Sequence, residues 1–113
     1  LFSGDTLFAM GCGRLFEGTA EDMFNAFQKL KSLPDKTLIY CGHEYTLSNG
    51  KFALSVEPDN PDLITRMKDV QKLRSENIPT IPTNMNLERK TNPFIRAKTA
   101  AEFKKLRELK DNF

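Results

Sequence analysis

The chain has 113 residues, of which 39% are hydrophobic, 17 are basic and 15 are acidic, and its formal net charge is +2. This length fits one ordinary domain, and the near balance of charge gives no reason to expect nucleic acid or a membrane surface as a partner. No apolar run reaches the roughly 20 residues that span a bilayer, and no basic-then-apolar signal segment opens the chain.

The first residues, Leu1-Phe2-Ser3, lack an initiating methionine and have the apolar character of a strand. Because a strand that starts at residue 1 has no turn leading into it, we expect the chain to be a piece of a longer protein. The two cysteines, Cys12 and Cys41, match no zinc-finger or disulfide spacing. We therefore expect two free thiols in a reducing cytoplasm, with a redox role for the pair as an alternative.

Residues 1–43 show the order strand, helix, strand. Thr19 and Asp22 form a variant of the capping box, which marks the start of a helix, and β-branched and aromatic residues before Cys41 are typical of a strand. The predicted elements are a strand at Leu1–Phe2, an extended stretch at Thr6–Met10, a helix at 20–33 and a strand at Thr37–Tyr40.

If the two outer strands are parallel neighbours, their C-terminal ends meet at one edge of the sheet, where ligands bind in open α/β sheets. Asp5 follows one strand, and His43, the single histidine, follows the other. Together these side chains can ligate a cation or transfer a proton. Taken singly, Asp5 is also a typical turn residue, and His43 could be a hydrogen-bonded structural histidine. Because catalytic zinc usually takes three protein ligands, the two residues form only part of a site.

Residues 44–113 are predicted to be mostly helical, with a long irregular crossing. Asn60 before Pro61 is typical of a helix start, and so is Thr99 three residues before Glu102. The prolines within residues 78–82 exclude a helix there. The predicted elements are a helix within Asn49–Val56, a helix from Pro61 to about Ser75, an extended stretch at Ile78–Pro82, a polar loop at Asn84–Pro93 and a helix from Thr99 to about Lys110.

Three basic residues are candidates for binding an anionic ligand. Arg107 and Lys110 are three residues apart and share one face of the last predicted helix. The alternative explanation for this pair is that cations favour a helix C-terminus. Arg14 follows the glycines of residues 11–13, and its guanidinium group can bind a carboxylate through two parallel hydrogen bonds.

Five sequence blocks stand in order along nearly the whole chain. They are Gly4-Asp5-Thr6-Leu7-Phe8, Gly11-Cys12-Gly13-Arg14, Phe16-Glu17-Gly18-Thr19, Cys41-Gly42-His43-Glu44-Tyr45-Thr46 and Thr91-Asn92-Pro93-Phe94-Ile95-Arg96. Together they resemble glyoxalase II, the hydroxyacylglutathione hydrolase of the metallo-β-lactamase superfamily. The resemblance implies an α/β fold, with the C-terminal part of a metallo-β-lactamase αββα sandwich in residues 1–43 and a helical glutathione-binding domain in residues 44–113.

The same resemblance implies two divalent metal ions, zinc in the first place and iron or manganese as alternatives. Asp5 corresponds to the carboxylate that bridges the metals and His43 to the last histidine ligand, which also borders the substrate. A metal-bound hydroxide would attack the thioester of S-2-hydroxyacylglutathione, such as S-D-lactoylglutathione, since two ions lower the pKa of water and stabilise the oxyanion. The products would be glutathione and D-lactate, in the second step of methylglyoxal detoxification.

The residues that the resemblance assigns to glutathione binding lie in four places along the chain. Arg14 stands where the family usually has a basic contact, and Tyr45 corresponds to a second contact. Arg107 and Lys110 correspond to the pair that holds the glycine carboxylate of glutathione. Phe16 stands where some relatives have tyrosine, so it keeps the apolar contact and loses the hydroxyl group.

The family's Thr-His-x-His-x-Asp-His block and a further histidine lie upstream in relatives and are absent from this sequence. We therefore predict that the chain is the C-terminal portion of the enzyme, that it needs the missing N-terminal part of the same protein, and that it is inactive alone. The alternatives are another thioesterase or hydrolase of the superfamily and a metal-free module that binds glutathione conjugates.

Overall fold

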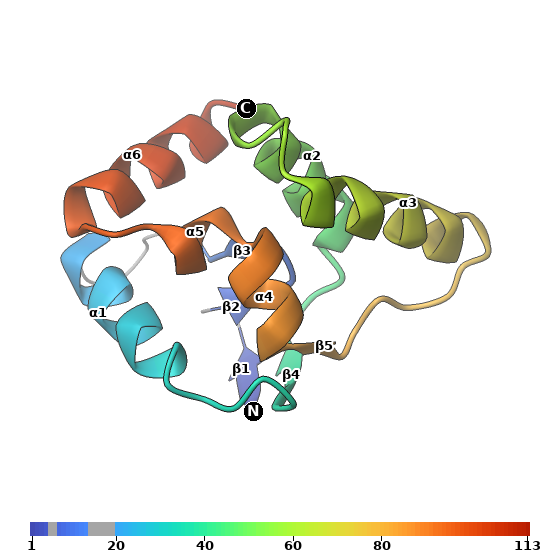
Figure 1. The fold of residues 1–113 in the computed structure, drawn as a ribbon, viewed down its shortest axis with the longest axis horizontal. Coiled ribbons are helices and arrows are strands. Elements are labelled where there is room, and N and C mark those ends of the chain that lie inside the picture. Colours follow the sequence, from blue (N-terminus) through green and yellow to red (C-terminus); the bar gives the residue numbers. More distant parts are fainter. Residues whose placement is uncertain (5–6, 14–19) are drawn as a thin grey trace.

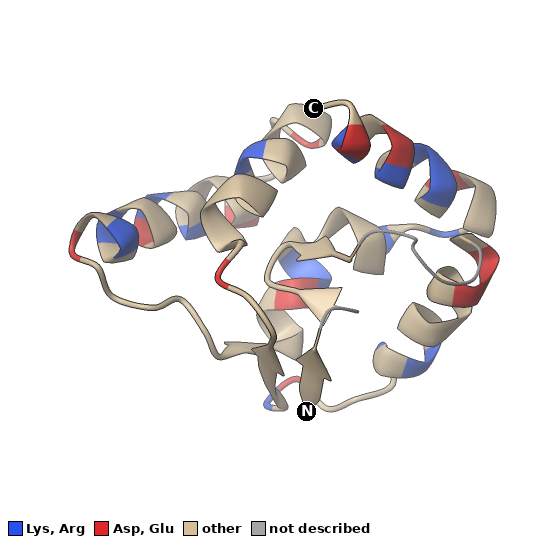
Figure 2. Cartoon of the chain, turned by 180° about the vertical axis from the view of Figure 1, so that it is seen from behind, with Lys and Arg blue, Asp and Glu red and all other residues tan. Residues whose placement is uncertain are grey.

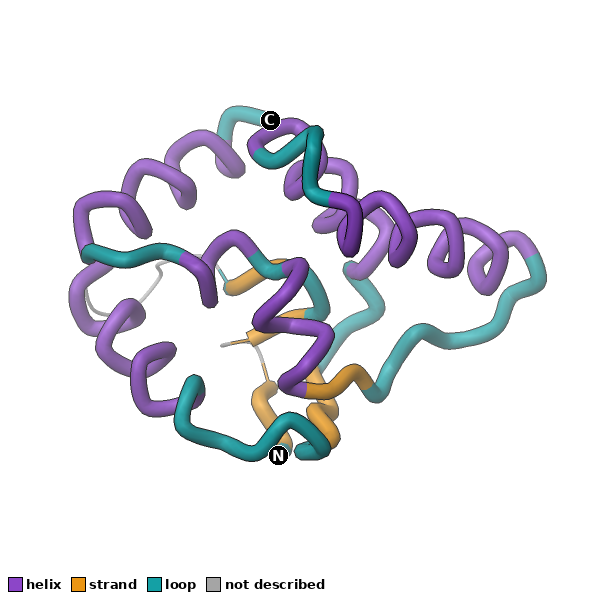
Figure 3. Tube along the Cα trace, in the orientation of Figure 1, coloured by secondary structure: helices purple, strands orange, loops and turns teal. Residues whose placement is uncertain are grey.

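The computed structural model describes residues 1–4, 7–13 and 20–113. These residues form a mixed α/β fold that is mostly helical, with two small sheets beside the helices (Figures 1 and 3). The strands are β1 (Phe2–Gly4), β2 (Leu7–Phe8), β3 (Gly11–Cys12), β4 (Leu38–Cys41) and β5 (Thr83–Asn84). The helices are α1 (Ala20–Leu30), α2 (Thr46–Val56), α3 (Pro61–Ser75), α4 (Met85–Thr91), α5 (Pro93–Arg96) and α6 (Ala100–Asp111).

The larger sheet has the strand order β1-β4-β5. Strands β1 and β4 pair in parallel across the connection that contains α1, which confirms the predicted strand, helix, strand order and the predicted pairing. Strand β5 pairs antiparallel with β4, with Leu38 opposite Asn84 and Ile39 opposite Thr83. It has only two residues, which is too short to show a pattern of alternating hydrophobicity in the sequence. Of the predicted extended stretch at Thr6–Met10, Leu7–Phe8 is strand β2, whereas Ala9–Met10 is the turn of a buried hairpin that leads to β3, and Thr6 lies outside the described residues.

The structure confirms two of the helix starts that the sequence indicates. The Asn60 side-chain oxygen accepts from the backbone N–H groups of Asp62 and Leu63 at the start of α3. At the start of α6, the Thr99 hydroxyl accepts from the Glu102 N–H at 3.1 Å. The first predicted helix is shorter than expected, because the chain leaves α1 at Leu30 through tighter turns. Thr19 lies outside the described residues.

The polar loop predicted for Asn84–Pro93 is wrong, because α4 and the first residue of α5 lie there. The Asn84 side-chain oxygen accepts from the Leu87 N–H at 2.9 Å and so caps α4. Asn92 caps α5 in the same way, accepting from the Phe94 N–H at 2.9 Å, with Pro93 at the first helical position. Asparagine suits a helix cap as well as it suits a loop, so polar composition alone misled the prediction.

A single aromatic cluster joins the two segments that the sequence analysis distinguished. Phe27 of α1 contacts Phe103 of α6 with ring centroids 5.3 Å apart, and Phe103 contacts Phe94 at 5.2 Å. Ile39 of β4 and Phe52 of α2 are buried in the same cluster. The division into residues 1–43 and 44–113 therefore stays a prediction, since these segments share a core.

Charged residues lie mainly on the outer helices. Lysine and arginine alternate with aspartate and glutamate along α3 and α6, so neither helix presents a stripe of one sign (Figure 2). Within the described ranges, none of the helices combines the length and apolar character that a membrane span requires.

Candidate functional site

The C-terminal ends of β1 and β4 meet at one edge of the three-stranded sheet. Gly4 pairs with Cys41, and the Gly42 N–H donates to the Gly4 carbonyl oxygen at 2.8 Å. His43 directly follows this bond in the chain. Asp5, the other residue predicted for the edge, lies outside the described residues.

His43 forms an aromatic group with Tyr45 and Phe8. The rings of His43 and Tyr45 stack with centroids 4.8 Å apart and planes 3° apart, and the Phe8 ring lies 6.0 Å from His43 and 5.0 Å from Tyr45. Phe8 is buried, whereas Tyr45 is 47% exposed and His43 is also exposed. The structure thus brings two of the predicted site residues together, with an imidazole whose ring is oriented by stacking and accessible to a ligand.

The described residues alone do not provide a full set of metal ligands. Within residues 1–4, 7–13 and 20–113, no group of three or more His, Cys, Asp or Glu side chains could hold a metal ion. His43 is described, whereas Asp5, Arg14 and Phe16 lie outside the described residues. Because catalytic zinc usually takes three protein ligands, His43 has to be joined by donors from elsewhere in the protein to form such a site.

The segment Leu7–Gly13 is buried, and distant side chains bind its backbone. In sequence, this segment lies between Asp5 and Arg14. The contacts are Asn92 Nδ2 to the Phe8 and Gly11 oxygens at 3.3 and 3.0 Å, Asn49 Nδ2 to the Ala9 oxygen at 3.3 Å, and the Met10 N–H to Glu88 Oε1 at 2.9 Å. Side chains of α2, α4 and the residue that caps α5 therefore hold the hairpin of β2 and β3.

The turn of this hairpin fits closely against α2. Met10 has a φ of 59°, a conformation that is uncommon outside glycine, and its side chain is buried beside Ala53 and Leu63. A Cβ atom on Gly11 would lie 2.6 Å from the Asn49 Cγ atom. Glycine is thus required at position 11 for Asn49 to approach the turn.

Glu88 is the centre of the buried polar network behind the hairpin. Its carboxylate is fully buried and accepts from Arg66 at 2.7 Å, from the Thr83 hydroxyl at 2.8 Å and from Asn92 Nδ2 at 2.9 Å, in addition to the Met10 N–H. Arg66 is also buried. Since a buried charge is costly unless it is paired and hydrogen-bonded, this arrangement fixes α3, α4 and the hairpin to one another.

Arg107 of α6 binds the same backbone segment at its far end. Its NH1 group donates to the Cys12 oxygen at 2.8 Å and to the Gly13 oxygen at 3.3 Å. The remaining nitrogens, Nε and NH2, contact the Asp111 carboxylate at 3.0 and 2.8 Å. The side chain is buried, so the structure places this predicted substrate residue among protein partners.

Lys110, the other member of the predicted pair, contacts a different aromatic ring from Arg107. Its Nζ atom is 5.8 Å from the centroid of the Phe52 ring, and the residue is partly buried. The Arg107 guanidinium instead lies 5.7 Å from the Phe94 ring centroid. The two basic side chains therefore flank the aromatic core from one helix.

Glu44, between His43 and Tyr45, ties the strand end to the long connection before β5. The Thr80 hydroxyl contacts both carboxylate oxygens at 2.9 and 2.7 Å and the Thr46 hydroxyl at 2.6 Å, and the Thr80 N–H also donates to Glu44. Partial burial raises the pKa of Glu44, but the hydrogen bonds from Thr80 and Thr46 and the charge of Arg74 outweigh burial, so the pKa lies below its usual value.

The two cysteines are free thiols, as predicted. Burial raises the pKa of the Cys12 thiol to about 12, although Arg107 opposes the shift. Burial also raises the pKa of Cys41. Because the thiolate is the reactive form of cysteine, these shifts argue against a nucleophilic role for either thiol.

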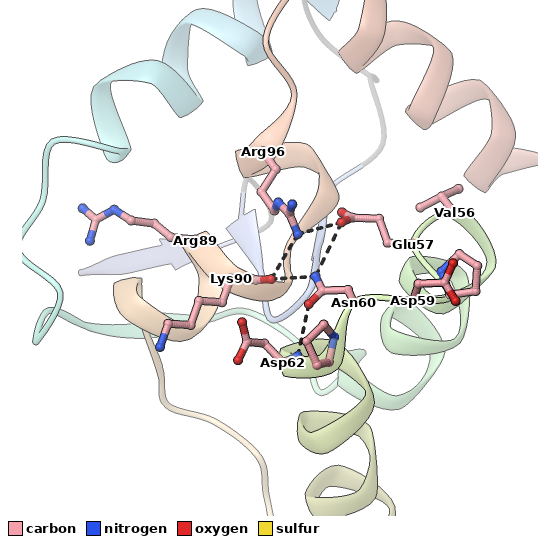
Figure 4. A pocket seen from close by; sticks show the side chains of 10 residues that line it. Val56, Glu57, Asp59, Asn60, Asp62, Arg89, Lys90 and Arg96 are labelled. Carbon is pink, nitrogen blue, oxygen red and sulfur yellow. Dashed lines mark hydrogen bonds and ion pairs between the residues drawn. The ribbon is translucent and has the colours of Figure 1, made fainter.

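A groove of 610 Å³ lies between the turn that joins α2 to α3 and the helices α4 and α5 (Figure 4). Two contacts join residues of its lining: Arg96 pairs with Glu57 at 2.6 Å, and Asn60 Nδ2 donates to the Lys90 carbonyl oxygen at 2.9 Å. Of the site residues that the structure describes, none lines this groove. These contacts join the turn between α2 and α3 to α4 and α5.

Comparison with known proteins relates this geometry to a family. The family model described as "Hydroxyacylglutathione hydrolase C-terminus" matches residues 44–113. The chain belongs to the hydroxyacylglutathione hydrolase family. This membership confirms the resemblance inferred from the five sequence blocks.

Relatives in the hydroxyacylglutathione hydrolase family are much longer than the chain. The hydroxyacylglutathione hydrolase of Pseudomonas savastanoi pv. phaseolicola is 60% identical over 98 residues, which cover 87% of this chain and 38% of that protein. The one from Pelagibacter ubique is 49% identical over 113 residues, covering 100% of this chain and 47% of that protein. The one from Rhizobium etli is 51% identical over 127 aligned residues, which cover 100% of this chain and 50% of that protein. The chain thus spans half or less of these relatives.

The sequence analysis missed the residues that hold the hairpin of β2 and β3. Asn92 stood in one of the five blocks, and Asn-Pro is a recognisable helix start, but its amide donor toward Gly11 had no signal. Glu88 and Asn49 were also missed, because a polar residue inside a helix gives no sign of being buried. Only their place on the inner face of α4 and α2 reveals the role.

Proposed function

We propose that the chain is the C-terminal part of a glyoxalase II, which hydrolyses the thioester of S-2-hydroxyacylglutathione in the cytoplasm. S-D-lactoylglutathione would give glutathione and D-lactate, the second step of methylglyoxal detoxification. The observation that carries the proposal is the parallel pairing of β1 with β4. This pairing joins Gly4 to Gly42 at 2.8 Å, and these glycines precede Asp5 and His43 in the sequence. The name that the relatives share supports the substrate class.

Two divalent ions are the proposed cofactors, with zinc in the first place and iron or manganese as alternatives. His43 fits this role because its imidazole is exposed at a strand end and oriented by stacking on Tyr45. We assign Asp5 as the bridging carboxylate from its place in the sequence. When bound, the ions would lower the pKa of a water molecule and stabilise the oxyanion that develops from the thioester.

We propose that Arg14, Phe16, Tyr45, Arg107 and Lys110 bind the glutathione moiety. Tyr45 extends into solvent beside His43, so it can reach a substrate that lies at the metal site. The Arg107 fork already binds one carboxylate, that of Asp111, at 3.0 and 2.8 Å. We propose that the glycine carboxylate of glutathione takes the place of Asp111 there.

The part of the intact protein that precedes this chain is the proposed partner of the outer sheet face. Phe2 is 87% exposed, Leu38 48% and Tyr40 42%, and the Phe2 and Tyr40 rings contact each other with centroids 5.5 Å apart. Leu38 and Tyr40 point to the same side of β4, since side chains alternate along a strand. An apolar face of this kind requires cover, and the longer relatives contain additional chain to provide it.

The test is the kinetics of the intact protein with S-D-lactoylglutathione and added zinc, iron or manganese. We expect hydrolysis, and we expect His43→Ala to lower both bound metal and kcat by at least about a hundredfold, since even indirect partners of metal ligands cost 10–100-fold. The 113-residue chain alone should be inactive. An intact protein that hydrolyses no glutathione thioester with any of the three metals would contradict the proposal.

Lys110→Ala distinguishes glutathione from other substrates. Loss of a contact made equally in the ground and transition states raises KM and leaves kcat unchanged. An unchanged KM would favour another thioesterase or hydrolase of the superfamily. Binding of a glutathione conjugate without turnover or bound metal would favour a metal-free binding module.

A further inference from the structure

The backbone of the segment from Phe8 to Gly13 is bound almost throughout by side chains that lie between positions 49 and 107. Five carbonyl oxygens, those of Phe8, Ala9, Gly11, Cys12 and Gly13, accept from asparagine or arginine, and the Met10 N–H donates to a carboxylate. The donors and acceptors lie 40 to 95 positions away in the sequence. Side chains distant in the sequence thus hold this one short hairpin and the residue that follows it.

Asn92 has two separate functions in this arrangement. Its side-chain oxygen caps α5 by accepting from the Phe94 N–H at 2.9 Å. Its amide nitrogen points the other way and donates to Gly11 at 3.0 Å and to Glu88 at 2.9 Å. Asn92 is fully buried. A serine could keep the capping function and would be too short to keep the contact with the hairpin.

Asn49 and Glu88 hold the two residues of the turn itself. Asn49 Nδ2 donates to the Ala9 oxygen at 3.3 Å, and Glu88 accepts from the Met10 N–H at 2.9 Å. A buried backbone group that loses such a partner favours a different turn conformation in which water can reach it. The turn therefore keeps its conformation only while both side chains are in place.

We propose that Asn92, Glu88 and Asn49 are positioning residues for the thioester hydrolysis, because they fix the hairpin that connects Asp5 to Arg14 in the chain. The proposal rests on the proposed function, in which Asp5 binds metal and Arg14 binds glutathione. One end of the hairpin leads to the reacting centre and the other to the substrate. Small displacements of groups at a reacting centre are expensive: a shift of about 1 Å can cost roughly a hundredfold in rate.

The experiment compares Asn92→Ser with a matched control in the intact protein. Asn84→Ser changes the same residue type at another helix cap, where the side-chain oxygen accepts from the Leu87 N–H at 2.9 Å. Three quantities are measured for each variant: kcat and KM with S-D-lactoylglutathione at saturating metal, the melting temperature, and hydrogen exchange of residues 7–13. The last of these does not depend on activity.

We expect faster exchange in residues 7–13 and a kcat roughly ten- to a hundredfold lower for Asn92→Ser. Asn84→Ser should change both the exchange rate and kcat by less than about twofold, which corresponds to less than about 0.5 kcal/mol in activation free energy. Asn49→Ser, which removes one hydrogen bond to the hairpin, that to the Ala9 oxygen, should shift exchange and kcat in the same direction by less than Asn92→Ser. It also serves as the test if Asn92→Ser does not fold.

Faster exchange with an unchanged kcat would overturn the positioning role and leave Asn92 a structural residue. Unchanged exchange in residues 7–13 would show that the side chains do not fix the hairpin, whatever the activity. If the unaltered protein hydrolyses no thioester, the proposed function fails and with it the catalytic part of this inference, whereas the exchange experiment still reports on the hairpin. The two failures are therefore distinguishable.

Discussion

The two segments that carry the predicted site are built in opposite ways. Leu7–Gly13 is buried, and asparagine, glutamate and arginine side chains from α2, α4, α6 and the α5 cap bind its backbone. Cys41–Tyr45 ends a strand at the surface, with His43 and Tyr45 exposed and stacked on each other. One segment is fixed through its backbone, and the other presents its side chains.

This difference indicates that the two segments have different roles in the proposed enzyme. A backbone bound on several sides in the interior changes conformation only by leaving polar groups unpaired. Exposed aromatic and imidazole side chains, by contrast, can meet a ligand without any rearrangement. The helical part of the chain thus holds the Leu7–Gly13 segment in place, in addition to making the substrate contacts proposed for it.

The largest expected effect comes from removing the charge of Glu88, at the centre of the buried polar network behind the hairpin. Glu88→Gln leaves the buried Arg66 without its ion-pair partner, which lies 2.7 Å away and is itself fully buried. Losing one member of a buried pair typically costs about 3–5 kcal/mol. We expect a loss of this size in the free energy of unfolding of the intact protein, measured by urea denaturation.

An exposed ion pair provides the control for this prediction. Glu57→Gln breaks the contact with Arg96 at 2.6 Å, in which the two side chains are 25% and 42% exposed. Pairs of this kind contribute at most about 1 kcal/mol. If Glu88→Gln costs no more than Glu57→Gln, the buried network is not what fixes the hairpin, and the contrast between the two segments is lost.

The sequence predicts the outer parts of this fold better than its interior. The parallel pairing of β1 with β4, the start of α3 at Asn60 and the start of α6 at Thr99 follow from local signals: turn residues, caps and strand composition. Helix α4 was missed because most of its residues are polar. Glu88 and Thr91 of this helix are buried and accept hydrogen bonds from the distant Arg66, which no local pattern reveals.

The same distinction applies to the candidate site. The pairing of β1 with β4 was predicted, and it explains why His43 stands beside Gly4 at the sheet edge. The stacking of His43 on Tyr45 could be anticipated only from their spacing of two residues. The contact between Arg107 and Cys12 spans 95 positions. It depends on how α6 packs against the aromatic core, and so it was not predictable from either residue's neighbours.

Glu44 gives the next test, because it holds the exposed segment in place. Its pKa is lowered, so its contribution to stability is fully present above its usual value of 4.5 and is lost as the pH falls through the lower value of the folded state. Glu44→Gln mimics the protonated acid. We expect it to lower the free energy of unfolding of the intact protein by about 1 kcal/mol at pH 7, somewhat less than is usual for a hydrogen bond to a charged group, because the Glu44 side chain is partly exposed to solvent.

The difference between Glu44→Gln and the unaltered protein should shrink as the pH falls below about 4.5, which urea denaturation at several pH values can measure. In a Thr80→Val background the pH dependence should be weaker, since the hydroxyl that contacts both carboxylate oxygens is gone. A difference that stays constant from pH 7 to the acid range would show that the carboxylate charge is not what these hydrogen bonds stabilise.

The smallest expected effect concerns Arg107. Its side chain binds the backbone of Cys12 and Gly13 and is also proposed to bind substrate. Asp111→Ala removes the carboxylate that contacts its Nε and NH2 atoms and is itself 44% exposed. Because Arg107 is buried but the Asp111 carboxylate is half exposed to water, we assign this pair no more than about 1 kcal/mol, so freeing the fork should lower KM for S-D-lactoylglutathione by up to about fivefold. Glu108→Ala, on the exposed side of the same helix, removes the same charge as a control. Equal falls in KM would mean that net charge alone attracts the substrate. An unchanged KM in Asp111→Ala would mean that Arg107 serves the Cys12 and Gly13 carbonyl groups and leaves the glycine carboxylate to Lys110.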